Sequence, residues 1–157
     1  MLVDGLPVPH RLITLIDRGL WPSTAAEAQW QNIHSLVPAE RIHLFAPEED
    51  KIYLMAPPFR TVATIRQSQG KFWDRFAALE GISPELSVDI GDFGLGSDSP
   101  IVLDYREDRN SPTVIRLKWR KAERLPNVWV RCADTLDKFA DMLALDRSDQ
   151  TSPVPTS

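Results

Sequence analysis

Residues 90–106 read Ile90-Gly91-Asp92-Phe93-Gly94-Leu95-Gly96-Ser97-Asp98-Ser99-Pro100-Ile101-Val102-Leu103-Asp104-Tyr105-Arg106. The glycine-rich first part predicts a loop or bulged turn over residues 91–96, because glycine adopts positive φ angles without steric cost. In the second part Ile101, Leu103 and Tyr105 recur at the two-residue period of a β-strand. The segment therefore predicts a turn that leads into a strand.

Further strands are expected on both sides of this segment. Val88 and Ile90 alternate with polar neighbours just before it, and apolar and charged residues alternate over residues 113–119. Residues 127–132 form another short apolar run. Because sheets with one solvated face alternate in this way, the pattern predicts an antiparallel meander with one wet face.

An amphipathic helix is expected to close the domain and to pack on the sheet. Asp134 is the predicted N-cap, and apolar residues follow at helical spacing, namely Leu136, Phe139, Ala140 and Leu143. Residues 146–157 are polar and contain prolines, which predicts a flexible tail.

The first forty residues are expected to be helical. Leu12, Leu15 and Ile16 have helical spacing within residues 10–18, and Gly19 is a plausible end of that helix. Thr24 with Glu27 three residues later predicts a capping box, with a helix that continues to about residue 34.

Between these regions the sequence predicts two short strands and a helix. Residues 41–45 and 51–55 are apolar runs separated by a turn-like segment. Residues 61–67 fit a strand or a helix equally well. The aromatic and apolar residues within 72–79 form one helical stripe, with Gly81 at its expected end. Together these elements predict a single α+β domain over residues 1–145.

The composition is that of an ordinary soluble protein. The chain has 157 residues, 43% hydrophobic and 25% charged, and one cysteine, Cys132. No apolar run approaches the roughly 20 residues that span a bilayer, and no signal peptide is visible. We therefore expect a cytoplasmic protein without membrane association, and Cys132 is expected to be a small buried side chain. Trp21 and Trp30 are expected to pack the N-terminal helices, and Trp119 and Trp129 to pack the sheet or to anchor an interface.

The charge pattern argues against a nucleic-acid binder. The net charge is −4, whereas phosphate binding favours a basic balance. Acids dominate residues 85–108 and bases dominate residues 116–131. These blocks are either two solvated faces of a sheet or a surface that contacts a partner.

A search for catalytic and cofactor motifs yields little. The glycine spacing in residues 91–96 is not that of a dinucleotide or phosphate loop. The three histidines are unpaired in sequence, and the acids do not follow a calcium-loop pattern. We therefore expect no enzyme activity, no cofactor and no bound metal. A small hydrolase or metal enzyme using the acidic loop stays as a weaker alternative.

Residues 90–106 resemble the SUKH superfamily, whose members show a GDFGxGSD block followed by a proline and an LDYR strand. The segment from Pro112 to Leu117, the strand with Trp129 and the final helix with Phe139 extend the resemblance to about residues 88–145. The resemblance implies a curved antiparallel sheet backed by helices from both ends of the chain.

The resemblance also implies a function in protein binding. Bacterial members include immunity proteins that neutralise a toxin domain, often a nuclease, and fungal members regulate cell-wall synthesis. The first expectation is an immunity protein, and the alternative is a housekeeping interaction or regulatory module. A homodimer formed through an exposed sheet edge also stays open.

An acidic surface could compete for the basic cleft of a nuclease toxin and speed up association. The candidate partner-binding residues are therefore Asp92, Asp98, Asp104, Glu107 and Asp108. A structural role stays open for the first three, as turn caps for Asp92 and Asp98 and as an ion-pair partner of Arg106 or Arg116 for Asp104.

Overall fold

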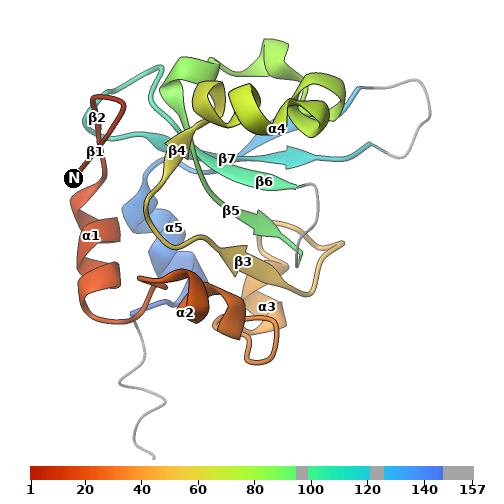
Figure 1. Cartoon of the computed structure of the whole chain (residues 1–157). Coiled ribbons are helices and arrows are strands. Elements are labelled where there is room, and N and C mark those ends of the chain that lie inside the picture. Colours follow the sequence, from red (N-terminus) through yellow and green to blue (C-terminus); the bar gives the residue numbers. More distant parts are fainter. Residues whose placement is uncertain (95–98, 121–125, 147–157) are drawn as a thin grey trace, which may run out of the picture.

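The protein is a mixed α+β domain in the computed structural model, which describes residues 1–94, 99–120 and 126–146 (Figure 1). Strands and helices alternate in the first half, and strands dominate the second half. The strands are β1 (Leu2–Val3), β2 (Leu6–Pro7), β3 (Ile52–Leu54), β4 (Arg60–Thr61), β5 (Ser87–Phe93), β6 (Pro100–Asp104), β7 (Thr113–Lys118) and β8 (Val128–Ala133). The helices are α1 (His10–Asp17), α2 (Ala25–Trp30), α3 (Ala39–Ile42), α4 (Val62–Phe76) and α5 (Leu136–Leu143), with short 3₁₀ turns η1 (Leu79–Gly81) and η2 (Pro84–Leu86).

The main sheet is antiparallel, as predicted. Its strand order is β3-β5-β6-β7-β8, and β4 pairs with β5 beyond the end of β3. A separate small hairpin joins β1 and β2. The meander β5-β6-β7-β8 corresponds to the alternating segments of the second half of the sequence, and its two edges are β8 and the β3/β4 side.

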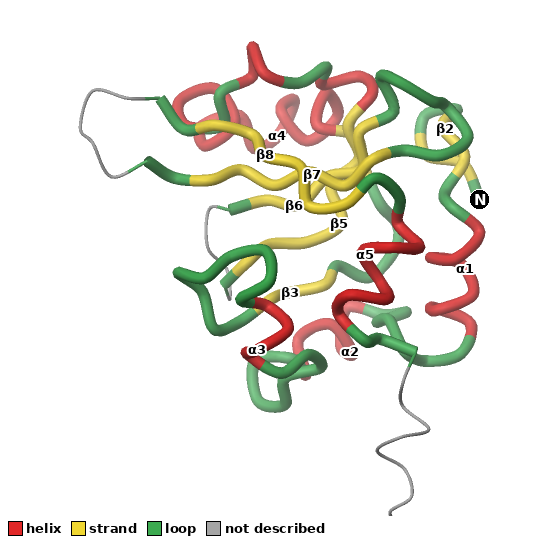
Figure 2. The backbone as a smooth tube through the Cα atoms, turned by 180° about the vertical axis from the view of Figure 1, so that it is seen from behind, coloured by secondary structure: helices red, strands yellow, loops and turns green. Residues whose placement is uncertain are grey.

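Helices cover both faces of the sheet, so the prediction of one wet face was wrong. Helix α4 lies on one face, while α1, α3 and α5 lie on the other (Figures 1 and 2). Val102, which alternates with Ile101 and Leu103 and was therefore expected to face solvent, is buried against α4. Strands buried on both faces carry apolar side chains at successive positions, which explains the run Ile101-Val102-Leu103.

The predicted strand over residues 41–45 is instead helix α3 and the turn that follows it. Pro38 precedes the helix in an extended conformation, and Ile42 and Ala46 are fully buried one helical turn apart. A short apolar run fits both the helical and the strand period, so length alone could not separate them.

Helix α4 resolves the ambiguous residues 61–67 in favour of a helix. The hydroxyl of Thr61 accepts a hydrogen bond from the backbone N–H of Thr64 at 3.2 Å and caps the helix. The helix is kinked at Gln69 and ends at Phe76, earlier than predicted. Ala78, rather than Gly81, adopts the left-handed conformation after it, with φ of 50°.

The helices predicted near the two ends of the chain are confirmed, but not all of their predicted ends and caps are. Helix α1 ends at Asp17. Gly19, the predicted end, follows two residues later with a φ of 75°, the left-handed conformation that glycine often adopts just after a helix. Helix α2 ends at Trp30, one turn earlier than predicted. Helix α5 is capped by Thr135, whose hydroxyl accepts from the backbone N–H of Lys138 at 3.1 Å. Asp134, the predicted cap, instead accepts a hydrogen bond from Arg131.

A β-bulge lies in the glycine-rich segment. The pairing of β5 with β6 shifts between Asp89 and Gly91, and β5 continues to Phe93. The loop predicted to begin at Gly91 therefore begins only at Gly94, which has φ of 89°.

Candidate functional site: a protein-binding surface

The acidic residues predicted to bind a partner do not gather in one place on the described part of the structure. In the pairing of β5 with β6, Asp92 is opposite Pro100 while Asp104 is opposite Ser87. These two carboxylates are therefore separated by five residues of strand, roughly 16 Å. Asp98 lies outside the described residues.

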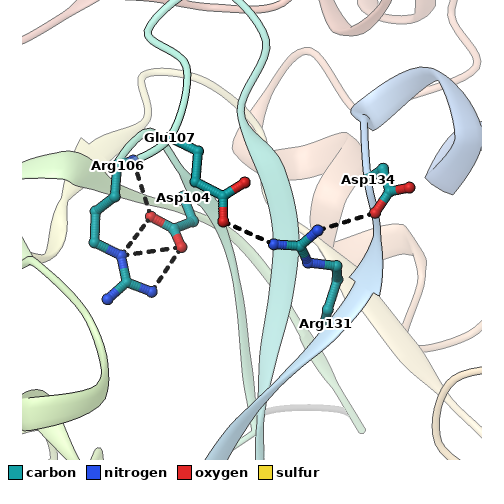
Figure 3. A network of polar contacts seen from close by, with 5 residues as sticks. All are labelled: Asp104, Arg106, Glu107, Arg131 and Asp134. Carbon is teal, nitrogen blue, oxygen red and sulfur yellow. Dashed lines mark hydrogen bonds and ion pairs between the residues drawn. The ribbon is translucent and has the colours of Figure 1, made fainter.

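Asp104 is buried and forms a local ion pair. Both of its oxygens accept hydrogen bonds from the guanidinium of Arg106, at 2.8–3.2 Å, and Oδ1 also accepts from the Arg106 backbone N–H (Figure 3). This pairing is one of the two structural alternatives considered for Asp104. It leaves the carboxylate 6% exposed, so little of it faces a partner.

Glu107 and Asp108 are exposed at the turn between β6 and β7. Glu107 accepts a hydrogen bond from Arg131 at 3.0 Å, and Arg131 also donates to Asp134 at 3.0 Å, which bridges the turn to the end of β8 (Figure 3). Asp108 accepts from the backbone N–H of Asn110 at 2.8 Å. Exposed pairs of this kind contribute little to stability, so these side chains are available to a partner at small cost.

The basic residues 116–131 are also not one surface, because Arg116 is buried. Its guanidinium donates to Glu48 at 2.8 Å and lies 5.5 Å from the centre of the Phe93 ring. Its Nε has no hydrogen-bond partner among the described residues. Burial favours the neutral form of Glu48, but hydrogen bonds from its own backbone and from Arg116 outweigh burial and lower its pKa. Arg116 is therefore part of the core.

Cys132 is partly buried and packs against the core, so it is less buried than predicted. Burial raises the pKa of its thiol to about 12, against a smaller opposing effect of Arg116. At neutral pH the side chain is therefore a protonated thiol, which is a poor nucleophile.

An exposed apolar segment, which sequence reasoning missed, runs from the last residue of α2 to the turn that follows α3. Trp30 is 56% exposed and stacks on His34, with ring centres 4.8 Å apart. Ile33 is 74% exposed, and Leu36 and Leu44 are also exposed. We call these four apolar residues the 30–44 surface.

Trp30 was expected to pack the N-terminal helices, and this prediction was wrong. Of the two N-terminal tryptophans only Trp21 is buried, where its indole N–H donates to the carbonyl oxygen of Met55 at 2.7 Å. Ile33 lies one turn after Trp30, since its backbone N–H donates to the Trp30 carbonyl oxygen at 3.0 Å, and this three-residue spacing was the signal that the two side chains share one side of the chain.

Gln31 fixes the 30–44 surface to the sheet. Its buried side-chain amide donates to the carbonyl oxygen of Leu54 and accepts from the backbone N–H of Leu54, both at 2.9 Å. These bonds give partners to the backbone N–H and carbonyl groups of Leu54 on edge strand β3, and they anchor the end of α2 to that strand. The apolar side chains beside Gln31 are therefore presented on a fixed support.

Within residues 1–94, 99–120 and 126–146, no three His, Cys, Asp or Glu side chains gather as metal ligands would. No helix in that part of the chain has both the length and the apolar content to cross a bilayer.

Comparison with protein-family models, curated proteins and solved structures finds no match to this chain. The likeness of residues 90–106 to the SUKH superfamily therefore remains an expectation.

Proposed function

We propose that this chain is a non-enzymatic protein-binding domain of the SUKH type, and specifically an immunity protein that binds and neutralises a bacterial toxin domain. The resemblance of residues 90–106 and 112–117 supports the family. The 30–44 surface supports binding of a protein. A nuclease is the favoured toxin class, because exposed Glu107 and Asp108 offer negative charge to a basic cleft.

The exposed apolar surface is the observation that carries this proposal. Eight large hydrophobic side chains are exposed in the described part of the chain, and half of them lie within residues 30–44. Exposed apolar side chains gathered in one segment mark protein interaction sites more often than scattered ones do. A tryptophan among them is the residue type most enriched at the energetic centre of interfaces.

Capture of the partner tests the proposal directly. Tagged protein is recovered from its native cells, bound proteins are identified by mass spectrometry, and each is then titrated as a purified component. A toxin domain bound at nanomolar affinity or tighter supports the immunity function. Recovery of wall-synthesis or signalling proteins alone would instead support the housekeeping alternative.

Replacement of Trp30 by alanine is expected to weaken binding of the captured partner by about thirtyfold or more, which is the usual effect of truncating a central tryptophan. Calorimetric titration measures the change. Trp119→Ala is the matched control, because Trp119 is also exposed, at 42%, but follows β7 and packs on Phe76. Equal losses for both variants would contradict a binding role of the 30–44 surface.

Charge reversal at the turn between β6 and β7 tests the acidic contribution. In Glu107→Lys/Asp108→Lys we expect association with a basic partner to slow roughly tenfold at low salt, with less effect at high salt, because exposed charges act mainly on the encounter rate. Stopped-flow kinetics measures it. Glu80 is an exposed acid that follows α4, and Glu80→Lys is the control. If Glu80→Lys slowed association equally, the change in net charge rather than the β6–β7 turn would explain the effect.

A further inference from the structure

A carboxylate on β5 points away from the main core and into a pocket. Its neighbours Val88 and Ile90 are fully buried in the core that includes α1 and α5. Because successive side chains of a strand point to opposite faces, Asp89 lies on the α4 face of the sheet. There it lines a pocket of about 280 Å³ between α2, α4 and the sheet.

The walls of this pocket are mostly apolar. They comprise two alanines of α2, Ile65 of α4, and Met55 with the prolines of the loop between β3 and β4. The polar lining residues are Tyr53, Arg60 and Asp89. Ligand sites in proteins have this composition, with apolar walls and a few polar groups that orient the ligand.

Asp89 lacks the hydrogen bonds that a buried carboxylate normally accepts. It is 5% exposed, and its Oδ1 accepts one long hydrogen bond, 3.3 Å, from the backbone N–H of Gly91. Its Oδ2 accepts no hydrogen bond, and Asp89 forms no ion pair, among the described residues. Burial therefore raises the pKa of Asp89 to about 7, although Gly91 and Arg60 favour the charged form. Since buried polar atoms nearly always have a partner, Oδ2 calls for a donor inside the pocket.

A second polar group of the pocket also has no partner. Arg60 is opposite Asp89 in the pairing of β4 with β5, and it lines the same pocket. Within the described part of the chain its guanidinium forms no hydrogen bond and no ion pair, with Asp89 or with any other side chain. The guanidinium offers donors to an oxygen atom, and its charge disfavours a further cation beside it. A group that joins the two side chains therefore needs an N–H or O–H donor, an oxygen acceptor and no positive charge.

We propose that this pocket binds a neutral amide carried on a small apolar group, whose N–H donates to Oδ2 of Asp89 and whose carbonyl oxygen accepts from Arg60. An amide has its donor and its acceptor on neighbouring atoms, and the apolar walls suit the group that carries it. That chemistry is shared by a free small amide and by the backbone of an apolar residue in a protein partner. The second source rests on the proposed function, whereas the binding site itself does not. Failure to recover a toxin would leave the site intact, and failure of the site would leave the 30–44 surface intact.

Two small probes of nearly equal shape test the site. N-methylisovaleramide has the donor and the acceptor, whereas methyl isovalerate has an ester oxygen in place of the N–H. Each is titrated into ¹³C- and ¹⁵N-labelled protein at about pH 8, where most of the Asp89 carboxyl is ionised. The readouts are the Asp89 carboxyl, the Arg60 Nε–H and the Ile65 methyl resonances.

We expect the amide to shift all three resonances saturably, with a Kd in the millimolar range that suits so small a ligand. The ester should bind at least tenfold more weakly, because it leaves Oδ2 of Asp89 without a donor. Equal binding of the two probes, or no saturable shift with the amide, would overturn the proposal.

Asp89→Val is the decisive variant, since it removes the acceptor and keeps a branched side chain that favours a strand. We expect it to weaken binding of the amide at least tenfold while thermal unfolding shows a folded protein. Arg60→Met, which keeps the apolar stem, should weaken binding at least threefold. Asp108→Asn, at an exposed acid, should bind like the wild type. Wild-type affinity in Asp89→Val would overturn the proposal.

A blocked amino acid separates the two sources of the ligand. N-acetyl-leucine-N-methylamide contains the same amide within a stretch of peptide backbone. Tighter binding of this compound than of N-methylisovaleramide supports a protein segment as the ligand. Weaker binding, or none, supports a free small amide.

Discussion

Asp89→Asn should raise the free energy of unfolding at pH 8 by on the order of 2–4 kcal/mol relative to the wild type. The wild-type carboxyl is 5% exposed and accepts one long hydrogen bond, so ionising it in the folded protein is costly. Asparagine has the same shape and carries no charge. The substitution therefore removes the cost without opening a cavity.

The pH dependence follows from the raised pKa of Asp89. Its folded value of about 7 lies above the ordinary value of 3.8, so between these two values the folded state binds more protons than the unfolded state. The contribution of Asp89 to stability is thus fully present below about pH 4 and is lost as the pH rises through 7. Above pH 7 the wild type carries the full penalty.

Urea unfolding at a series of pH values between about 4 and about 8.5 measures this effect. The wild-type stability should fall across the window relative to Asp89→Asn, and the two curves should converge at the acidic end. Asp108→Asn, at an exposed carboxylate, should follow the wild type. Parallel curves for the wild type and Asp89→Asn would mean that Asp89 titrates near its ordinary pKa.

Strand periodicity predicted most of the sheet because it depends on local sequence. The alternation of Ile101, Leu103 and Tyr105 identified β6, the same period identified β7, and a short apolar run identified β8. Periodicity could not show that the other face of the sheet is buried as well. Val102 is apolar and is covered only because α4 packs across the sheet, a contact between segments some forty residues apart.

The candidate binding features depend on such tertiary contacts and were largely missed. Asp89 is one of the polar residues that alternate with Val88 and Ile90, so the pattern placed it on the wet face of the sheet, and nothing in its sequence neighbourhood indicated burial. Its position results from the bulge and from α4 above it. Trp30 was expected to pack the N-terminal helices, whereas in the structure its neighbour Gln31 docks on β3 and Trp30 is exposed.

Gly91→Ala should lower the free energy of unfolding by roughly 2–4 kcal/mol, more than most single substitutions. A methyl group at this position would overlap the carbonyl oxygen of Tyr53 and lie 3.5 Å from Cα of Leu54. These are backbone atoms of β3, which cannot move aside as a side chain can. The two strands must therefore separate, and the bulge that orients Asp89 and Asp92 must shift with them.

Two measurements separate this steric effect from the general cost of replacing a glycine. Gly19→Ala is the control, because Gly19 has no neighbour within 4 Å of an added methyl group and only its φ of 75° opposes alanine, at a cost of about 1 kcal/mol. Hydrogen exchange should be faster in Gly91→Ala at the Met55 amide, which donates to Ile90 at 2.9 Å across the two strands. Equal destabilisation of both variants, with unchanged protection of Met55, would mean that β5 can accept a side chain at residue 91. If instead Gly91→Ala loses that protection while Gly19→Ala keeps it, the close approach of β3 to β5 is what requires a glycine at residue 91.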